Sequence, residues 1–238
     1  MIQVQHVTKR YGSMLANNDV NLEAGDGGLS VLLGANGAGK STLIKCICGL
    51  LRFEGSIKVN GFDNHSLEAK RLLGYVPEFP AMYPMLTVEE HLQFIARAYR
   101  LKDWEVYGNE LMTRFELTDK KAKLGQELSK GMQQKVSICC ALLPRPKAVI
   151  FDEPFVGLDP HAIRELKQLI AGLRDEGNSV LISTHMIDSI EEAWDTVYIM
   201  KNGSIMETRN KKDIDSKNSL ESIYFAITEG TLESGNTI

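Results

Sequence analysis

The distribution of apolar and polar residues along the chain predicts a mixed α/β fold. Residues 2–7 ("IQVQHV") alternate with the period of a half-exposed strand. Residues 29–34 ("LSVLLG") are almost entirely apolar and stop at glycine, which is typical of a strand buried on both faces. The same two patterns predict further strands near 19–23, 72–77, 147–151, 179–183 and 196–200. Asn60 and Gly61, a favoured tight-turn pair, predict a hairpin.

The apolar period changes to that of a helix after Thr87. Val88, Leu92 and Ile95 share one helical face, and Thr87 with Glu90 forms a capping box. The stretch 87–143 is therefore expected to be mainly helical and inserted between strand-rich segments. Other helices are expected over 41–50, 104–116, 160–175 and 187–194. The last ten residues are polar and are expected to fray.

Composition narrows the class of protein. The chain has 238 residues, 43% of them hydrophobic, which suffices for a sizeable core. A net charge of −4 does not favour nucleic acid as the main partner. No apolar run approaches the roughly 18 residues of a membrane span, and the start lacks a secretion signal. The sequence therefore indicates a cytosolic protein, in which any membrane role needs another chain.

The four cysteines form two close pairs, Cys46 with Cys48 and Cys139 with Cys140. A zinc or iron–sulfur site requires wider ligand spacing. Both pairs also fall in apolar helical stretches. Reduced structural thiols are the expected state.

A phosphate-binding loop is predicted at residues 34–41. "GANGAGKS" matches G-x-x-x-x-G-K-[ST] and has the required strand before it and helix after it. Glycines allow several backbone N–H groups to point at one phosphate, and the helix N-terminus adds its positive dipole end. Lys40 is expected to reach the β- and γ-phosphates. The Ser41 hydroxyl is a hard oxygen ligand suited to Mg²⁺.

Two carboxylates follow the predicted strand at 147–151. In "AVIFDEP", Asp152 is expected to bind the Mg²⁺ shell, and Glu153 is left to orient and deprotonate an attacking water. The sequence thus places a metal ligand and a general base behind the phosphate-binding loop.

The order of the motifs resembles the ATP-binding cassette (ABC) family. After the loop come "LSKGMQQ" (128–134), "VIFDEP", "GLDP" (157–160) and "STH" (183–185). The resemblance spans residues 1 to about 208 and is closest to a nucleotide-binding subunit of an ABC transporter. It implies a P-loop NTPase core with a mixed sheet, an antiparallel β subdomain and an inserted α-helical subdomain. The implied division of the single domain 1–238 is a core at 1–86 and 144–208, a helical subdomain at 87–143 and a helical tail at 209–238.

The resemblance also implies how the site works. In this family two cassettes pair head to tail around two ATP molecules. The signature, Leu128 to Met132, then faces the γ-phosphate held by the other chain. Catalytic roles fall to Glu153, His185 and Lys40, with Ser41, Asp152 and Glu78 around Mg²⁺. The implied ATP-binding residues are Tyr11 (stacked on adenine), Gly34, Ala35, Asn36, Gly37, Ala38, Gly39, Lys40, Ser41, Thr42, Glu78, Ser129, Gly131 and Asp159.

A polytopic membrane subunit is the second implied partner, which would hold the chain at the cytoplasmic face of the membrane. "EFPAMYPML" (78–86) combines large apolar side chains with two prolines, and apolar side chains in a loop fold inward or meet a partner. In the family this is where the cassette contacts the membrane subunit, and Phe79, Met82 and Tyr83 are expected to line that groove.

Two departures from the family pattern concern charge. Glu78 stands where the family usually has Gln; a carboxylate there can still bind Mg²⁺ but adds negative charge near the triphosphate. Lys130 replaces a glycine of the usual L-S-G-G-Q signature, and either adds a cation near the phosphate or points to solvent. Neither change removes an indispensable group, so an active ATPase is expected.

The class of function has alternatives. "YPMLTVEEHLQFIARAY" (83–99) resembles cassettes of bacterial exporters of drugs, antibiotics and peptides. A soluble cassette of an assembly system, such as iron–sulfur cluster biogenesis, would share every catalytic motif. Chromosome-organising ATPases are rejected because only 89 positions (129 − 40) separate Lys40 from Ser129, without sustained heptads. A regulatory cassette that barely hydrolyses ATP stays open because of Glu78 and Lys130.

Overall fold

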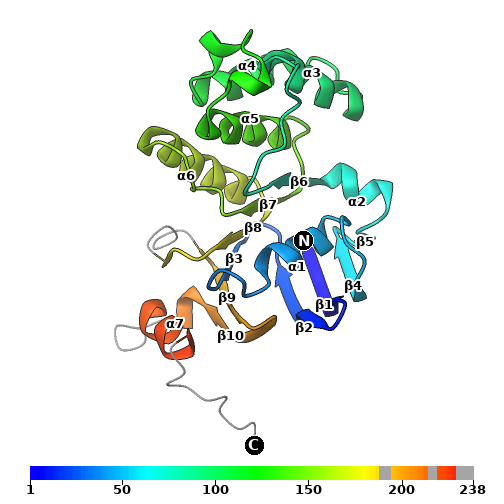
Figure 1. Ribbon diagram of the computed structural model, residues 1–238, viewed down its shortest axis with the longest axis vertical. Helices are drawn as coiled ribbons and strands as arrows, with labels where there is room; N and C mark the ends of the chain where they lie inside the picture. Colours follow the sequence, from blue (N-terminus) through cyan, green and yellow to red (C-terminus); the bar gives the residue numbers. More distant parts are fainter. Residues whose placement is uncertain (188–193, 214–218, 229–238) are drawn as a thin grey trace, which may run out of the picture.

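The computed structural model describes residues 1–187, 194–213 and 219–228, which form two β-sheets with helices around them (Figure 1). The antiparallel sheet has the strand order β2-β1-β4-β5. Its strands are β1 (Ile2–Tyr11), β2 (Met14–Ala24), β4 (Glu54–Val59) and β5 (Phe62–Asp63). The β4–β5 hairpin turns at Asn60 and Gly61, both at positive φ, as the Asn-Gly pair predicts.

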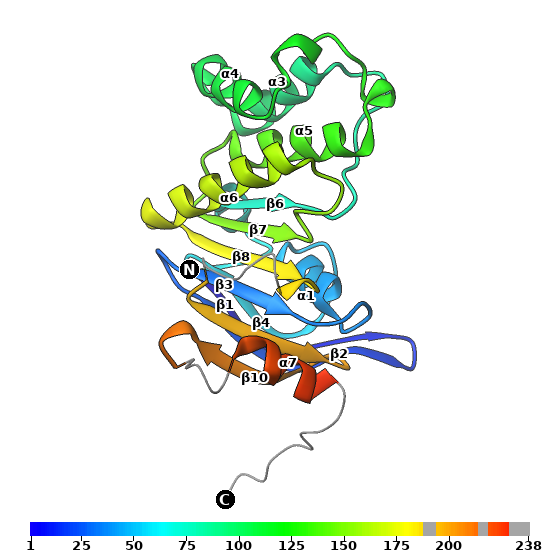
Figure 2. The same ribbon diagram turned by 90° about the vertical axis from the view of Figure 1, so that its left-hand side faces the viewer.

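The larger sheet has the strand order β10-β9-β3-β8-β7-β6. Its strands are β3 (Leu29–Leu33), β6 (Leu73–Val76), β7 (Ala148–Asp152), β8 (Ser179–Thr184), β9 (Thr196–Lys201) and β10 (Ser204–Asn210). Neighbouring strands run parallel from β9 to β6, and β10 pairs antiparallel with β9. The parallel arrangement brings the ends of β3, β7 and β8 to one edge of the sheet (Figure 2).

Both faces of the larger sheet are covered, which explains its continuous apolar strands. On one face, Ala148 and Ile150 of β7 pack with α1 (Lys40–Ile47) and the antiparallel sheet. On the other face, Val149 and Phe151 pack with α5 (Lys130–Leu142) and α6 (Pro160–Asp175). The site residues thus stand on strands fixed from both sides.

The segment between β6 and β7 is helical, as its period predicts. It contains α3 (Val88–Tyr99), α4 (Trp104–Arg114) and α5, which gather at one end of the molecule (Figure 1). The Thr87–Glu90 capping box is present: Glu90 N donates to Thr87 Oγ1, and Thr87 N donates to the Glu90 carboxylate. The expected mixed sheet, antiparallel sheet and helical insertion are therefore confirmed.

Several boundaries differ from the sequence expectation. β2 starts at Met14 rather than near residue 19, because its outer end pairs with β1 as an exposed hairpin that alternation alone does not reveal. Helix α2 (Leu67–Leu72), capped by Ser66, was not expected, since it is short and continues directly into β6. The expected helix 187–194 lies largely outside the described residues. The tail contains α7 (Leu220–Thr228), and residues 229–238 lie outside the description.

The described residues contain no helix with both the length and the apolar character that a membrane span requires. The four cysteines are free thiols. Burial raises the pKa of Cys46 to about 11 and that of Cys140 to about 12, so the thiols stay protonated and unreactive.

We predict that Leu92→Ala destabilises the protein by about 2–5 kcal/mol, because Leu92 is fully buried between α3 and the rest of the helical segment and its loss leaves a cavity. Urea unfolding measures the change. Val106→Ala on α4 is the matched control. Val106 is exposed, and its replacement should change stability by no more than about 0.5 kcal/mol. Equal losses in the two variants would contradict the assigned packing.

Candidate nucleotide-binding site

The loop between β3 and α1 has the backbone of a phosphate cradle. Gly37 and Gly39 have φ values of 82° and 108°, which side chains other than glycine rarely adopt. A Cβ on Gly39 would lie 2.6 Å from the carbonyl oxygen of Ala16, and one on Gly34 2.5 Å from that of Met200. The loop therefore needs glycine both for its conformation and for its close approach to neighbouring backbone.

Lys40 begins α1 and is almost fully buried at the base of this loop. Its Nζ donates to the carbonyl oxygens of Gly34 at 2.6 Å and Ala35 at 3.3 Å. It also lies 3.4 Å from Glu153 Oε1. The ammonium is thus held inside the loop by oxygen atoms that a phosphate can replace.

Asp152 ends β7 and receives two hydroxyl groups. Ser41 Oγ donates to Asp152 Oδ1 at 3.1 Å, and Ser183 Oγ donates to the same atom at 2.5 Å. Burial raises the pKa of Asp152, and these two hydrogen bonds act in the opposite direction. Asp152 and Ser41 together offer the hard oxygen ligands that Mg²⁺ prefers, and the predicted metal ligands fit that ion.

Glu153 follows at a positive φ of 48°, which is uncommon for this residue type. Its backbone N–H donates to the carbonyl oxygen of Ser183 at 3.1 Å, which fixes the turn. His185 Nδ1 lies 3.0 Å from Glu153 Oε2. The contact between His185 Nδ1 and Oε2 does not have the angles of a hydrogen bond. The contact between Lys40 Nζ and Oε1 does not have them either, so Oε1 accepts no hydrogen bond from the described residues. A buried carboxylate oxygen without a hydrogen bond suits a base that awaits its water.

Lys40, Ser41 and Glu153 line a cleft of about 660 Å³, whereas Asp152 and His185 contact these residues without lining it. The predicted residues that line it are Asn36, Gly37, Gly39, Lys40, Ser41, Thr42, Glu78 and Glu153. Sequence reasoning missed the start of β2 (14–16) and the turn 202–203, which also line the cleft. It missed Ser183 as well, although a serine directly after the apolar run Val180–Ile182 of β8 was a signal that this position is held by a hydrogen bond.

Other predicted residues lie elsewhere. Tyr11 does not line the cleft of its own chain; it is exposed at the end of β1, with Lys9 Nζ 4.9 Å from its ring centroid. Its contact with adenine stays a prediction. Gly34, Ala35 and Ala38 complete the loop without lining the cleft.

The signature residues also stand apart from this cleft. Ser129 caps α5 by accepting from Met132 N at 3.3 Å. Gly131 has no room for a side chain, because a Cβ would lie 2.6 Å from the Gly157 carbonyl oxygen. Asp159 caps α6 and pairs with Lys135 Nζ at 2.7 Å; the lysine and the capped N–H hold the pKa of Asp159 below its usual value.

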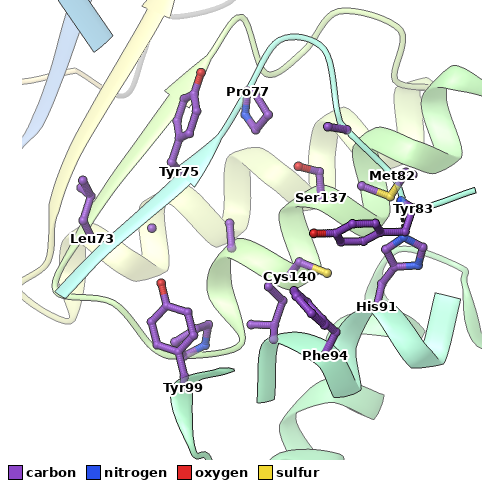
Figure 3. A pocket seen from close by; sticks show the side chains of 15 residues that line it. Leu73, Tyr75, Pro77, Met82, Tyr83, His91, Phe94, Tyr99, Ser137 and Cys140 are labelled. Atoms are coloured by element: carbon purple, nitrogen blue, oxygen red, sulfur yellow. Dashed lines mark hydrogen bonds between the residues drawn. The ribbon is translucent and has the colours of Figure 1, made fainter. Parts of the chain in front are cut away.

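A groove of about 400 Å³ lies between β6, α3 and α5 (Figure 3). Met82, Tyr83 and Phe94 are among the residues that line it, and the Tyr83 ring meets Phe94 edge-on at 5.4 Å. His91 accepts a hydrogen bond from Tyr83 N at Nε2 (2.9 Å), and its Nδ1–H donates to the Thr87 carbonyl oxygen (2.7 Å). His91 is thus a buried, fully bonded support of this groove.

Segment 83–86, which begins with the groove residue Tyr83, also contacts residues 124–126, just before the signature. A Cβ on Gly125 would lie 2.4 Å from the Tyr83 carbonyl oxygen. Gly125 N donates to the Leu86 carbonyl oxygen at 2.8 Å. Segment 83–86 therefore packs backbone to backbone against segment 124–126.

Residues 17–156, more than half of the chain, match the family described as ABC transporter. The chain belongs to the ABC transporter family. It is 37% identical over 90% of its length, and 72% of the relative's, to the uncharacterized ABC transporter ATP-binding protein YhaQ of Bacillus subtilis. It is 31% identical to the linearmycin resistance ATP-binding protein LnrL of the same organism, over 91% of this chain and 71% of that one.

Solved structures agree with this assignment of an ABC ATPase. An ATP-binding subunit of an ABC transporter is 35% identical and superposes with a TM-score of 0.90, covering 96% of this chain and 99% of that one. A dimeric ATP-binding cassette in a post-hydrolysis state, bound to ADP and phosphate, is 25% identical with a TM-score of 0.77, over 88% and 98% of the two chains. The chain is thus an ATP-binding ATPase subunit with the ABC fold. These relatives do not favour the assembly-system alternative.

We predict that Asp152→Asn makes the nucleotide-free ABC ATPase more stable at neutral pH. A carboxyl whose pKa is raised by folding stabilises the folded state below its unfolded pKa of 3.8, and that contribution is lost as pH rises through the folded value. Asn cannot ionise but still accepts the two hydroxyl hydrogen bonds. Thermal unfolding should show a higher Tm than the parent at pH 7 and a smaller difference near pH 3.

The same variant should lose about 100-fold or more of its ATP turnover, because a neutral amide is a weak Mg²⁺ ligand. Ser30→Ala is the control for both measurements: Ser30 lies on β3, which β8 separates from β7, and its hydroxyl donates to the Glu23 carbonyl oxygen at 3.5 Å. A less stable Asp152→Asn protein at pH 7 would contradict the assigned burial cost.

Proposed function

We propose that two copies of this ABC ATPase, or one copy with a related cassette, pair head to tail around two ATP–Mg²⁺ and drive export through separate membrane subunits. The observation that carries the proposal is that the residues expected to bind ATP lie in two separate places of the chain. Lys40, Ser41 and Glu153 gather in it, whereas Ser129 and Gly131 stand elsewhere in the same chain. A second chain placed head to tail supplies them.

The base in this mechanism is Glu153. Its turn fixes the carboxylate beside Lys40, and the oxygen without a hydrogen bond can accept the proton of a water aimed at the γ-phosphate. His185, 3.0 Å from the other carboxylate oxygen, is placed to orient that water and the phosphate. When ATP binds, the Lys40 ammonium donates to phosphate oxygens in place of the carbonyl oxygens of Gly34 and Ala35.

Mg²⁺ would be held by Ser41 and Asp152, together with Glu78, which also lines the cleft. When bound, it neutralises charge on the transferring phosphoryl group. Ser183 Oγ donates to the same Asp152 oxygen that Ser41 contacts, and this hydrogen bond fixes the position of the carboxylate.

The groove of Figure 3 is the proposed contact with the membrane subunit, which would keep the chain at the cytoplasmic face of the membrane. Met82 and Tyr83 line it, and Phe79 is 67% exposed just before it. Export is favoured because the relative LnrL is named for resistance to linearmycin. In this proposal the helical unit comprises residues 87–143, between core segments 1–86 and 144–208, with a tail from 209.

We predict that Glu153→Gln lowers ATP turnover by about 100-fold or more, since the amide cannot take a proton. The variant should still bind ATP and should accumulate as a dimer in ATP–Mg²⁺. Light scattering gives the solution mass, and phosphate release gives turnover. The parent chain in ADP is the control and should stay monomeric. A variant that binds ATP tightly yet remains a monomer would contradict the symmetric pair.

We predict that Tyr83→Asp weakens binding of the membrane subunit by about tenfold or more, because a charge replaces an aromatic side chain in the groove. ATP affinity should not change, since Tyr83 does not line the nucleotide cleft. Co-purification with the subunit and nucleotide titration measure the two effects. Val106→Asp, at an exposed position of α4, is the control. Loss of both activities in Tyr83→Asp would contradict the assignment.

A further inference from the structure

Lys130, the first residue of α5, is held by contacts rather than by an ion pair. Its Nζ lies 5.0 Å from the centroid of the Phe79 ring. Its methylene carbons lie 3.8 to 3.9 Å from the position that a Cβ on Gly157 would take. The salt bridges among the described residues do not include it. Lys130 is exposed, so its ammonium stands at the surface, one residue after the capping Ser129, without a salt bridge among the described residues.

The nucleotide cleft has the opposite imbalance. Lys40 is the cation that lines it, whereas Glu78 and Glu153 line it as carboxylates and Asp152 ends the neighbouring strand. A triphosphate adds further negative charge. Like charges brought close together in a partly buried site repel strongly, so a bound nucleotide needs cations beyond Lys40. Mg²⁺ supplies part of this positive charge, and the Glu78 carboxylate cancels part of it.

We propose that Lys130 of one chain contacts the γ-phosphate in the cleft of the other chain and compensates there for Glu78. This inference rests on the proposed head-to-tail pair, in which Ser129 and Gly131 approach that phosphate. Lys130 lies between them in sequence and is the residue of this segment that carries a charge. The two departures, Glu78 and Lys130, are thus a matched pair of opposite charges that meet only when two chains close.

Phe79 has a distinct part in this arrangement. A cation–π contact at an exposed ring is weak, whereas a charge-assisted hydrogen bond to a phosphate is strong. Phe79 therefore keeps the flexible lysine directed along the surface while the chains are apart, and releases it when a phosphate is available. Glu78 directly precedes Phe79. One short segment of each chain therefore carries the carboxylate of its own cleft and also positions that chain's Lys130 for the cleft of the other chain.

The first test is a charge-rescue experiment on purified protein with ATP–Mg²⁺. Lys130→Met keeps the methylene stem and removes the charge, and we expect turnover at saturating ATP to fall about tenfold. Adding Glu78→Gln should restore most of that loss, because the carboxylate that Lys130 offsets is gone and Gln, unlike Asn at position 152, is the residue that the family usually has at position 78. Lys102→Met, at an exposed position before α4, is the control and should keep full turnover. Unchanged turnover in Lys130→Met, or a double variant no faster than it, would overturn the proposal.

The second test asks from which chain the lysine comes. In a mixture of Lys130→Met and Glu153→Gln chains, each mixed dimer has one site with intact Glu153 that faces an intact Lys130 of the other chain. Single-turnover phosphate release from that site should match the parent protein. Release as slow as in the Lys130→Met protein alone would show that Lys130 acts within its own chain and would overturn the proposal.

The two proposals fail in distinguishable ways. If Glu153→Gln forms no ATP-dependent dimer, the head-to-tail function itself is wrong. If that dimer forms normally but charge rescue and mixing both fail, the pairing stands and only the role of Lys130 is wrong.

Discussion

The structure depends on keeping three charged groups out of water at one edge of a sheet. Lys40, Asp152 and Glu153 are between 2% and 6% exposed. Burying charges is costly unless each is paired or hydrogen-bonded. The surrounding architecture meets that requirement: β8 presents Ser183 to Asp152, and the glycine loop presents carbonyl oxygens to Lys40. The Glu153 carboxylate lies 3.4 Å from Lys40 Nζ and 3.0 Å from His185 Nδ1. Only strands anchored on both faces hold such a cluster in place.

Much of the fold and of the phosphate-binding loop could be predicted from the sequence, because these features depend on residues that are adjacent in the chain. The alternation of β1, the continuous apolar runs of β3 and β7, and the Thr87 cap each depend on a few adjacent residues. The phosphate loop was predictable for the same reason: its glycines, lysine and serine are consecutive. Asp152 could be assigned because it directly ends a recognisable buried strand.

What the sequence did not reveal depends on contacts between distant segments. Ser183 meets Asp152 because β7 and β8 pair in parallel register, and no pattern within β8 states that partner. The lining of the cleft by residues 14–16 depends on how far the β1–β2 hairpin extends. The role of His91 could not be predicted either, because both of its hydrogen-bond partners are main-chain groups that leave no mark in the sequence.

The close approach of Gly125 to Tyr83 gives the molecule a mechanical property. Two backbones in direct contact, with no side chain between them to yield, are closely packed, and closely packed groups transmit strain to one another. Segment 124–126 leads within three residues to Ser129. Movement of segment 83–86 is therefore transmitted toward the start of α5 through main-chain contacts. The glycine at position 125 sets the stiffness of that transmission.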